Sequence, residues 1–251
     1  MSDPILIEVC VDSVASAVAA ERGGAGRVEL CSNLLEGGVT PSAGLIELAR
    51  DRTSIGLQVM IRPRGGDFCY TPEEFETMRL DIVAARKLGA DGIVVGILNA
   101  DGSVDIERTR ELVELARPLN VTFHRAFDMS ADLLRSLECI CATGADRLLT
   151  SGGKKTALQA VEQIARLVEA ARGRVAIMAC GGINHHNAVS IIEQTGVREI
   201  HVGLRSPVAS PMLHRNLELT LGTAGECEYQ RFQVLEENVL TLHQAIGLAR
   251  T

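Results

Sequence analysis

Residues 89–95 read GADGIVV, and they pass from the glycine that ends a helix-like segment into a continuous apolar run. Glycine is favoured at helix C-termini, and an unbroken apolar run is typical of a parallel strand that is covered on both faces. The same order of glycine, short polar step and strand-like run recurs at 26–27, 144–146 and 196–198. This regularity indicates repeated β/α units within one fold.

Strand-like and helix-like runs alternate outward from this stretch to both ends of the chain. Eight strand candidates occur, at 5–11, 27–32, 56–63, 92–98, 121–127, 147–151, 174–180 and 199–205. Helix candidates occur at 13–22, 72–88, 105–116, 132–142, 157–171, 187–194 and 237–249. Eight units predict the α/β class and a closed (β/α)8 TIM barrel, as a single domain over residues 1–251. An irregular excursion is expected near 206–230, before the last helix.

The alternative architecture is an open doubly wound sheet, which usually has a glycine-rich nucleotide-binding turn after its first strand. Here that turn reads Val11-Asp12-Ser13, without the pattern G-x-G-x-x-G. The sequence therefore favours the closed barrel and indicates no nucleotide cofactor.

The composition limits the partners that we expect. The net charge is −7, so the chain lacks the basic surface on which non-specific nucleic-acid binding depends. No apolar run reaches the roughly 18 residues of a membrane span, and residues 1–4 lack the basic start of a signal peptide. The seven cysteines are scattered without a C-x-x-C pair, which argues against a disulfide framework or a structural zinc site. We expect a cytoplasmic protein without a nucleic-acid or membrane partner.

Polar residues interrupt strand candidates that should be apolar on both faces. They are Glu8, Glu29, Gln58, Arg62, His124, Arg125, Thr150 and His201. An unpaired charge is costly inside a protein, so this set predicts a shared polar interior or cleft. Because side chains alternate along a strand, Glu8 and Cys10 face the same way, as do Glu29 and Cys31. In neighbouring barrel strands, these two carboxylates and two thiols would converge.

Three loops add polar groups at strand ends, where barrel active sites lie. The loop 62–67 contains two arginines and two glycines, which suit an anion site or a simple polar turn. The segment 124–128 offers a base, a cation and an acid. The glycines at 181–182 resemble the phosphate-binding corner of many barrels, although glycines there also serve tight turns.

These positions divide into candidate roles. The acid–base candidates are Glu8, Glu29, His124 and Asp128, because burial and neighbouring charges shift the pKa values of such groups. The candidate ligand-binding residues are Arg62, Arg64, Asp67, Arg125, Thr150, Ser151, Gly181, Gly182 and His201. For Glu8 and Glu29 a structural ion pair is the alternative, and for His201 a hydrogen-bonded core histidine.

Several of these phrases together resemble the copper homeostasis family called CutC. The most specific are MIRPRGGDF at 60–68 and VTFHRAFD at 121–128. Others are EVCVDS at 8–13, AERGGA at 20–25, RVELCS at 27–32, EGGVTPS at 36–42, LTSG at 149–152, His201 and Arg215-Asn216. The resemblance implies a barrel fold, a cytoplasmic location, a homo-oligomer (dimer or tetramer) and a role in copper handling, without an established reaction.

Two functional hypotheses follow, and the sequence does not decide whether the chain is an enzyme. Cu(I) prefers soft thiolate ligands at low coordination number, and Cys10 and Cys31 are the best pair, with Cys180 as a third candidate. The alternative is a barrel enzyme that acts on a small anionic substrate, a phosphate or a carboxylate, by carboxylate and histidine acid–base chemistry. A binding or assembly module is a third class, without an identifiable surface.

Overall fold

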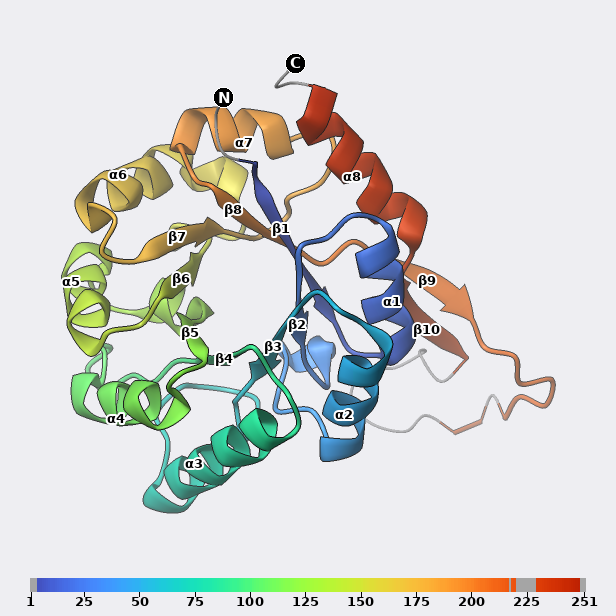
Figure 1. The fold of residues 1–251 in the computed structure, drawn as a ribbon, viewed down its shortest axis with the longest axis horizontal. Helices are drawn as coiled ribbons and strands as arrows, with labels where there is room; N and C mark the ends of the chain where they lie inside the picture. The colour runs from blue at the N-terminus through green and yellow to red at the C-terminus, as the bar shows by residue number, and fades with distance from the viewer. Residues whose placement is uncertain (1–3, 217, 220–228, 249–251) are drawn as a thin grey trace.

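A closed barrel of eight parallel strands forms the centre of the computed structural model, which describes residues 4–216, 218–219 and 229–248 (Figure 1). In barrel order the strands are β1 (Leu6–Val11), β2 (Arg27–Leu30), β3 (Gly56–Met60), β4 (Gly92–Val95), β5 (Asn120–Phe123), β6 (Arg147–Thr150), β7 (Ala176–Ala179) and β8 (Glu199–Val202). Strand β8 pairs in parallel with β1, which closes the barrel. The predicted TIM barrel is confirmed.

In the described part of the chain, eight α-helices surround the strands in an outer ring (Figure 1). They are α1 (Val14–Arg22), α2 (Ala43–Arg52), α3 (Pro72–Lys87), α4 (Ile106–Ala116), α5 (Leu133–Thr143), α6 (Val161–Ala171), α7 (Ala188–Thr195) and α8 (Glu236–Leu248). Short 3-10 turns follow three of the strands at η1 (Leu34–Glu36), η2 (Arg125–Met129) and η3 (Ala157–Ala160). None of the helices in the described part of the chain combines the length and apolar character needed to cross a membrane.

Helix α2 is the one helix of the outer ring that the sequence analysis did not predict. Its buried residues are Ile46 and Ala49, and Gly44 lies in its first turn. The side chain of Ser42 caps it by accepting a hydrogen bond from the Leu45 backbone N–H at 3.2 Å. Since Ser42 follows a proline, the local sequence is equally typical of a loop.

The apolar core lies between the barrel and the helices rather than inside the barrel. Strand residues such as Val9, Val28 and Val59 belong to one large buried cluster that also includes helix side chains. Two small clusters are separate from it, and they consist of Cys31, Met60 and Val94, and of Leu149, Met178 and Cys180. The alternate strand positions therefore give the barrel a polar and sulfur-rich interior.

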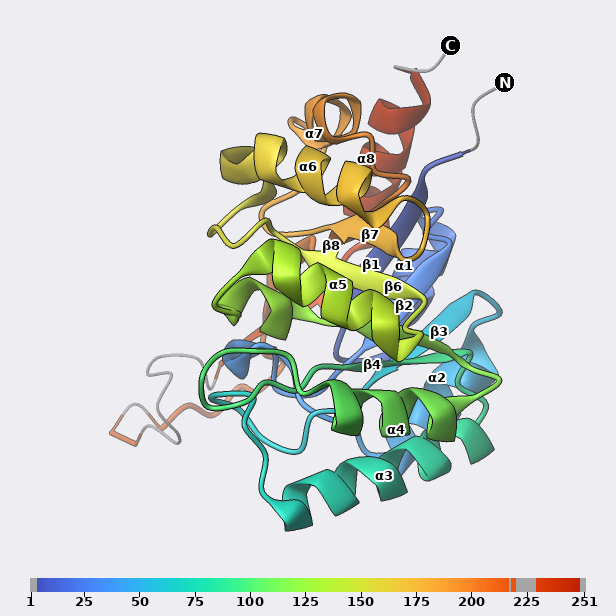
Figure 2. The same ribbon diagram turned by 90° about the vertical axis from the view of Figure 1, so that its left-hand side faces the viewer.

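A two-stranded antiparallel ribbon follows the barrel. Strands β9 (Arg205–Ala209) and β10 (Gln230–Val234) pair with each other, and the Val234 backbone N–H donates to Ser16 Oγ at 3.2 Å. Figure 2 shows the orange segment that follows β9, residues 210–216, extending away from the barrel. The sequence predicted an irregular excursion over 206–230, but its two ends are strands; residues 217 and 220–228 lie outside the described residues.

Candidate functional site

Two thiols and a carboxylate meet at the mouth of the barrel, between β1 and β2. Cys10 lies beside Glu29 in the strand register, and Cys10 Sγ is 3.3 Å from Glu29 Oε2. Cys31 Sγ is 3.5 Å from the same oxygen and 3.9 Å from Cys10 Sγ. The alternation along both strands thus brings together the groups that the sequence placed on one side.

His201 links this cluster to Glu8. Its Nδ1 lies 2.7 Å from Glu8 Oε1, and its Nε2 lies 3.8 Å from Glu29 Oε2. Strand β8 provides His201 because it pairs with β1, where Glu8 is the register partner of His201. Five of the predicted residues therefore form one continuous chain of polar contacts across β8, β1 and the end of β2: Glu8, Cys10, Glu29, Cys31 and His201.

A group of ion pairs deeper in the barrel compensates the charge of Glu8. Arg27 pairs with Glu8, and its Nη2 lies 2.5 Å from Glu199 Oε2. Arg147 Nε lies 2.8 Å from the same Glu199 oxygen. The sequence analysis missed Arg27, Arg147 and Glu199, because each opens its strand and resembles part of a polar connection. Arg27 stands two residues before Glu29, so strand alternation could have placed it in the interior.

The Glu8–His201 pair is charged. Burial alone would raise the pKa of Glu8, but the hydrogen bond with His201 and the charge of Arg27 lower it to about 2. Burial would lower the pKa of His201, but the charges of Glu29 and Glu8 and the hydrogen bonds with Cys10 and Glu8 raise it well above its ordinary value. His201 is therefore an imidazolium held against a carboxylate.

The two thiols differ in ionisation. The hydrogen bond with Cys31, followed by the hydrogen bond and charge of His201, lowers the pKa of Cys10 to about 5. The same contact with Cys10, together with burial, raises the pKa of Cys31 well above its ordinary value. Burial and the negative charge of Cys10 raise the pKa of Glu29 in the same way. The cluster therefore favours a thiolate at Cys10 beside a protonated thiol at Cys31, and it disfavours the charged form of the Glu29 carboxyl group.

A pocket of about 350 Å³ opens above this cluster. Its lining includes Cys10, Glu29, His201, Arg62, His124 and Arg125 from the predicted set. The other lining residues lie outside the list of candidate site residues: Leu34, Glu36, Gly37, Met60, Phe68, Leu149, Gly203 and Arg205. The apolar members gave no signal in the sequence, because such residues are equally typical of a core.

Arg64 and Asp67 lie outside this pocket, although they belong to the same loop as Arg62. Arg64 Nε donates to Glu74 Oε1 at 2.6 Å, and Arg64 Nη2 to Asp67 Oδ1 at 3.1 Å. Glu74 also closes the capping box with Thr71 at the start of α3. These contacts attach the loop 62–67 to α3, and they occupy the side chains that the sequence assigned to a ligand.

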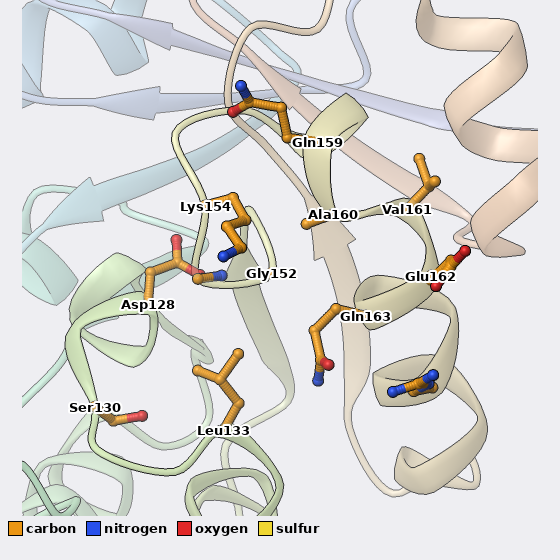
Figure 3. A pocket seen from close by; sticks show the side chains of 12 residues that line it. Asp128, Ser130, Leu133, Gly152, Lys154, Gln159, Ala160, Val161, Glu162 and Gln163 are labelled. Carbon is orange, nitrogen blue, oxygen red and sulfur yellow. The ribbon is translucent and has the colours of Figure 1, made fainter.

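Asp128 organises the loops after β5 and β6 instead of facing the pocket. Its carboxylate accepts hydrogen bonds from Thr150 Oγ1 at 2.5 Å, Ser151 Oγ at 2.9 Å and the Gly153 backbone N–H at 3.0 Å. Arg125 Nε lies 2.9 Å from Asp128 Oδ2. Figure 3 shows Asp128 at the edge of a separate pocket of about 620 Å³ beside α6. With its oxygens engaged in this way, Asp128 is poorly placed to act as a base.

The glycines at 181 and 182 also lie away from the pocket lining. Both have a positive φ, of 92° and 69°. A Cβ on Gly181 would lie 3.1 Å from Ser151 Cβ, and one on Gly182 would lie 3.1 Å from Thr156 Cγ2. The tight turn and the packing against the loop after β6 account for both glycines.

Two overlapping sets of donor atoms could hold a metal ion. Cys10, Glu29 and Cys31 form one, and Glu8, Glu29 and His201 form the other, with each set's atoms within 4.8 Å of one another. Cys180 belongs to neither, because it packs against Leu149 and Met178 on the other side of the barrel. The first set offers soft sulfur donors and the second only nitrogen and oxygen donors.

The fold and the site define a TIM barrel with a thiolate–carboxylate cluster at the carboxyl ends of its first, second and last strands. The model of the CutC family matches residues 5–206, and the chain belongs to this family. A human relative named copper homeostasis protein cutC homolog is 47% identical over 96% of this chain and 89% of its own length. A CutC family protein of Chromobacterium violaceum is 44% identical over 97% of this chain and 99% of its own length.

Solved structures agree with this assignment. A crystal structure described as a copper homeostasis protein CutC, from Streptococcus agalactiae, has a TM-score of 0.75 and 35% identity, and covers 79% of this chain and 98% of its own. The thiamine phosphate pyrophosphorylase of Pyrococcus furiosus has a TM-score of 0.59 at 16% identity, and covers 98% of both chains. The second likeness shows the barrel fold alone.

Proposed function

We propose that this chain binds one Cu(I) ion through Cys10 and Cys31, as part of copper homeostasis in the cytoplasm. The observation that supports the proposal most directly is the pair of sulfur atoms 3.9 Å apart at the mouth of the barrel, with one of them ionised. Thiolate is the ligand that Cu(I) prefers. The names of the human and bacterial relatives agree with a role in copper homeostasis. The described cysteines are free, which suits a reducing compartment.

The spacing of the two sulfurs fits a three-coordinate ion. With metal–sulfur bonds of about 2.3 Å, sulfurs 3.9 Å apart subtend an angle of about 115° at the metal. This angle leaves room for a third donor in the same plane. Glu29 Oε2 touches both sulfurs and is the nearest oxygen, while Met60 packs against Cys31 and offers a thioether.

The charges of the cluster also suit a monovalent cation. A second thiolate next to Cys10 is disfavoured in the free protein, as the raised pKa of Cys31 indicates. A cation between the sulfurs removes this penalty and displaces the Cys31 proton, because metal ligands must be deprotonated. Binding at neutral pH therefore releases a proton from Cys31, while Cys10 is already ionised.

A competition titration tests this proposal. Reduced protein under anaerobic conditions is titrated with Cu(I) against a chromophoric chelator, and we expect one ion per chain. The Cys10→Ser and Cys31→Ser variants should each bind at least a hundredfold more weakly. Cys69→Ser is the matched control, because Cys69 is exposed and lies outside both donor sets. Equal affinity in wild type and the Cys10→Ser/Cys31→Ser double variant would refute the proposal.

A further inference from the structure

Arg62 is a buried cation without a carboxylate partner. It is 5% exposed and lines the pocket above the thiol cluster. Its Nη1 donates to the carbonyl oxygens of Glu36 at 2.8 Å and Gly38 at 2.9 Å, and its Nη2 to that of Gly66 at 2.8 Å. Within residues 4–216, 218–219 and 229–248 no ion pair reaches its guanidinium. The Tyr70 hydroxyl lies near the guanidinium, but the Nε–H has no acceptor within hydrogen-bonding distance. Carbonyl oxygens satisfy its hydrogen bonds only in part and leave its charge uncompensated.

His124 presents a second donor without a partner in the same pocket. It is 3% exposed, and its Nδ1 accepts a hydrogen bond from the Ala126 backbone N–H at 3.1 Å. A ring that accepts at Nδ1 has its proton on Nε2, and Nε2 has no acceptor among the described residues. Burial, with the charge of Arg62, lowers the pKa of His124 to about 3, so the ring is neutral.

Phe68 brings these two donors together. Its ring centroid lies 5.0 Å from the Arg62 guanidinium carbon and 5.1 Å from the centre of the His124 ring. Met60 and Leu149 provide apolar wall on the same pocket. The lining therefore combines one positive charge without an ion pair, one neutral donor and apolar side chains, and it also contains the Cys10 thiolate and the Glu36 carboxylate. These negative groups disfavour a dianion, so the pocket suits a single negative charge attached to an apolar body.

We propose that this pocket binds a small organic monocarboxylate, and that a shift of the buried Arg62 and His124 side chains lets its oxygens accept hydrogen bonds from Arg62 Nε–H and His124 Nε2–H. Its apolar body lies against Phe68, Met60 and Leu149. The other two arginines of the lining already face carboxylates, Arg125 at 2.9 Å from Asp128 and Arg205 at 3.9 Å from Asp12. A phosphate dianion would therefore meet only one uncompensated cation, which favours the singly charged carboxylate.

Benzoate is the probe for this site, with benzamide as its neutral isostere and phenyl phosphate as its dianionic counterpart. Calorimetric titration of reduced, metal-free protein should show one benzoate per chain, bound at least tenfold more tightly than benzamide and no more weakly than phenyl phosphate. Absence of benzoate binding, equal binding of benzamide, or a preference for phenyl phosphate overturns the proposal.

Substitutions locate the bound carboxylate. His124→Asn keeps an acceptor for the Ala126 N–H and removes the Nε2–H donor, so benzoate affinity should fall at least tenfold. Arg62→Met should cause a similar loss, but it also removes a donor from three carbonyl groups, so His124→Asn decides the result. Arg205→Met removes a charge from the same lining and should change affinity less than threefold. A loss in Arg205→Met as large as in His124→Asn overturns the placement.

The carboxylate site and the copper site can fail separately. The Cys10→Ser/Cys31→Ser double variant should bind benzoate at least as tightly as wild type, because it lacks the thiolate charge. The His124→Asn variant should keep its Cu(I) affinity within threefold. Loss of benzoate binding in the double variant would place the anion at the thiol cluster and overturn the assignment to Arg62 and His124.

Discussion

At the scale of single residues, the barrel mouth separates two histidines by their surroundings. His201 faces Glu8 and Glu29, and its ring is a positively charged imidazolium. His124 faces Arg62, and its ring is a neutral imidazole with one N–H. Sequence alone identifies both as polar residues near strand ends and cannot tell them apart. The difference depends on which strands are neighbours, which is a property of the closed barrel.

The ionisation of Cys10 predicts its reactivity. Because its pKa is lowered to about 5, its rate of alkylation by iodoacetamide should change less than threefold between pH 6 and pH 8. The rate of a free thiol in solution rises by about two orders of magnitude from pH 6 to pH 8, because its thiolate fraction rises by that factor. In His201→Gln the loss of a positive charge and a hydrogen bond should restore a rise with pH. Mass spectrometry of the Cys10 peptide measures the rate, and a wild-type profile parallel to that of the free thiol contradicts the prediction.

The neutral state of His124 predicts a loss of stability in acid. Its folded pKa of about 3 lies below its ordinary value of 6.5, so between these values the unfolded chain binds a proton that the folded chain does not. Stability is therefore lost as the pH falls from 6.5 toward 3. From pH 7 to pH 5, wild type should lose about 2 kcal/mol more than His124→Phe in urea unfolding. Equal losses in both proteins would show that His124 titrates normally.

At the scale of helices and strands, local sequence patterns predicted most helices and strands of the barrel. They did not predict helix α2 or the contacts between elements that are distant in the sequence. The glycine steps before β4, β6 and β8 located those strands, because a helix end and an apolar run are both local signals. Helix α2 was missed although its apolar pattern is no weaker than that of α1, α3 or α8, because the proline before Ser42 and the glycine at position 44 are also typical of a loop. Within the polar run at 62–67, Arg64 attaches the loop to α3, since it reaches Glu74 across ten residues, whereas Arg62 lines the pocket.

Replacement of two glycines by alanine should change the free energy of unfolding in opposite directions. Gly44, in α2, has open space around an added Cβ, so Gly44→Ala should stabilise the protein by about 0.5–1 kcal/mol through helix propensity. Gly96 directly follows β4, and its Cβ would lie 2.4 Å from the His124 ring. Gly96→Ala should therefore destabilise by about 1–3 kcal/mol, because the buried ring must shift. Urea unfolding measures both, and a neutral Gly96→Ala would show that the ring moves freely.

At the scale of the whole molecule, the polar interior connects the strands that close the barrel. Arg27 on β2 joins Glu8 on β1 to Glu199 on β8, and Arg147 reaches the same Glu199 from β6. Sequence analysis predicted that Glu8 and Glu29 need partners but could not supply them, because strand order is set only when the barrel closes. The oligomeric state is also a property of the whole molecule. We expect a homo-oligomer, a dimer or a tetramer, and light scattering would measure its molar mass in solution.

The closing ion pairs yield a prediction for the entire barrel. Arg27→Met keeps an apolar stem of similar length but leaves Glu8 and Glu199 without their shared cation in the interior. Each carboxylate keeps one other cation, Glu8 the His201 imidazolium and Glu199 the Arg147 guanidinium. The free energy of unfolding should therefore fall by about 3 kcal/mol, the lower end of the cost of breaking a buried ion pair. Arg174→Met is the control, because Arg174 and Glu138 form an exposed pair at 2.6 Å whose loss should cost no more than about 1 kcal/mol.

Both variants are compared by urea unfolding at pH 7, followed by fluorescence of an environment-sensitive dye because the chain has no tryptophan. If the interior pairs hold β1, β2 and β8 together, Arg27→Met should also accelerate hydrogen exchange of the backbone amides along these three strands. If exchange is accelerated only in β2, the ion pairs stabilise that strand alone and not the closure of the barrel between β8 and β1. A loss in Arg27→Met no larger than in Arg174→Met would mean that the carboxylates find other partners.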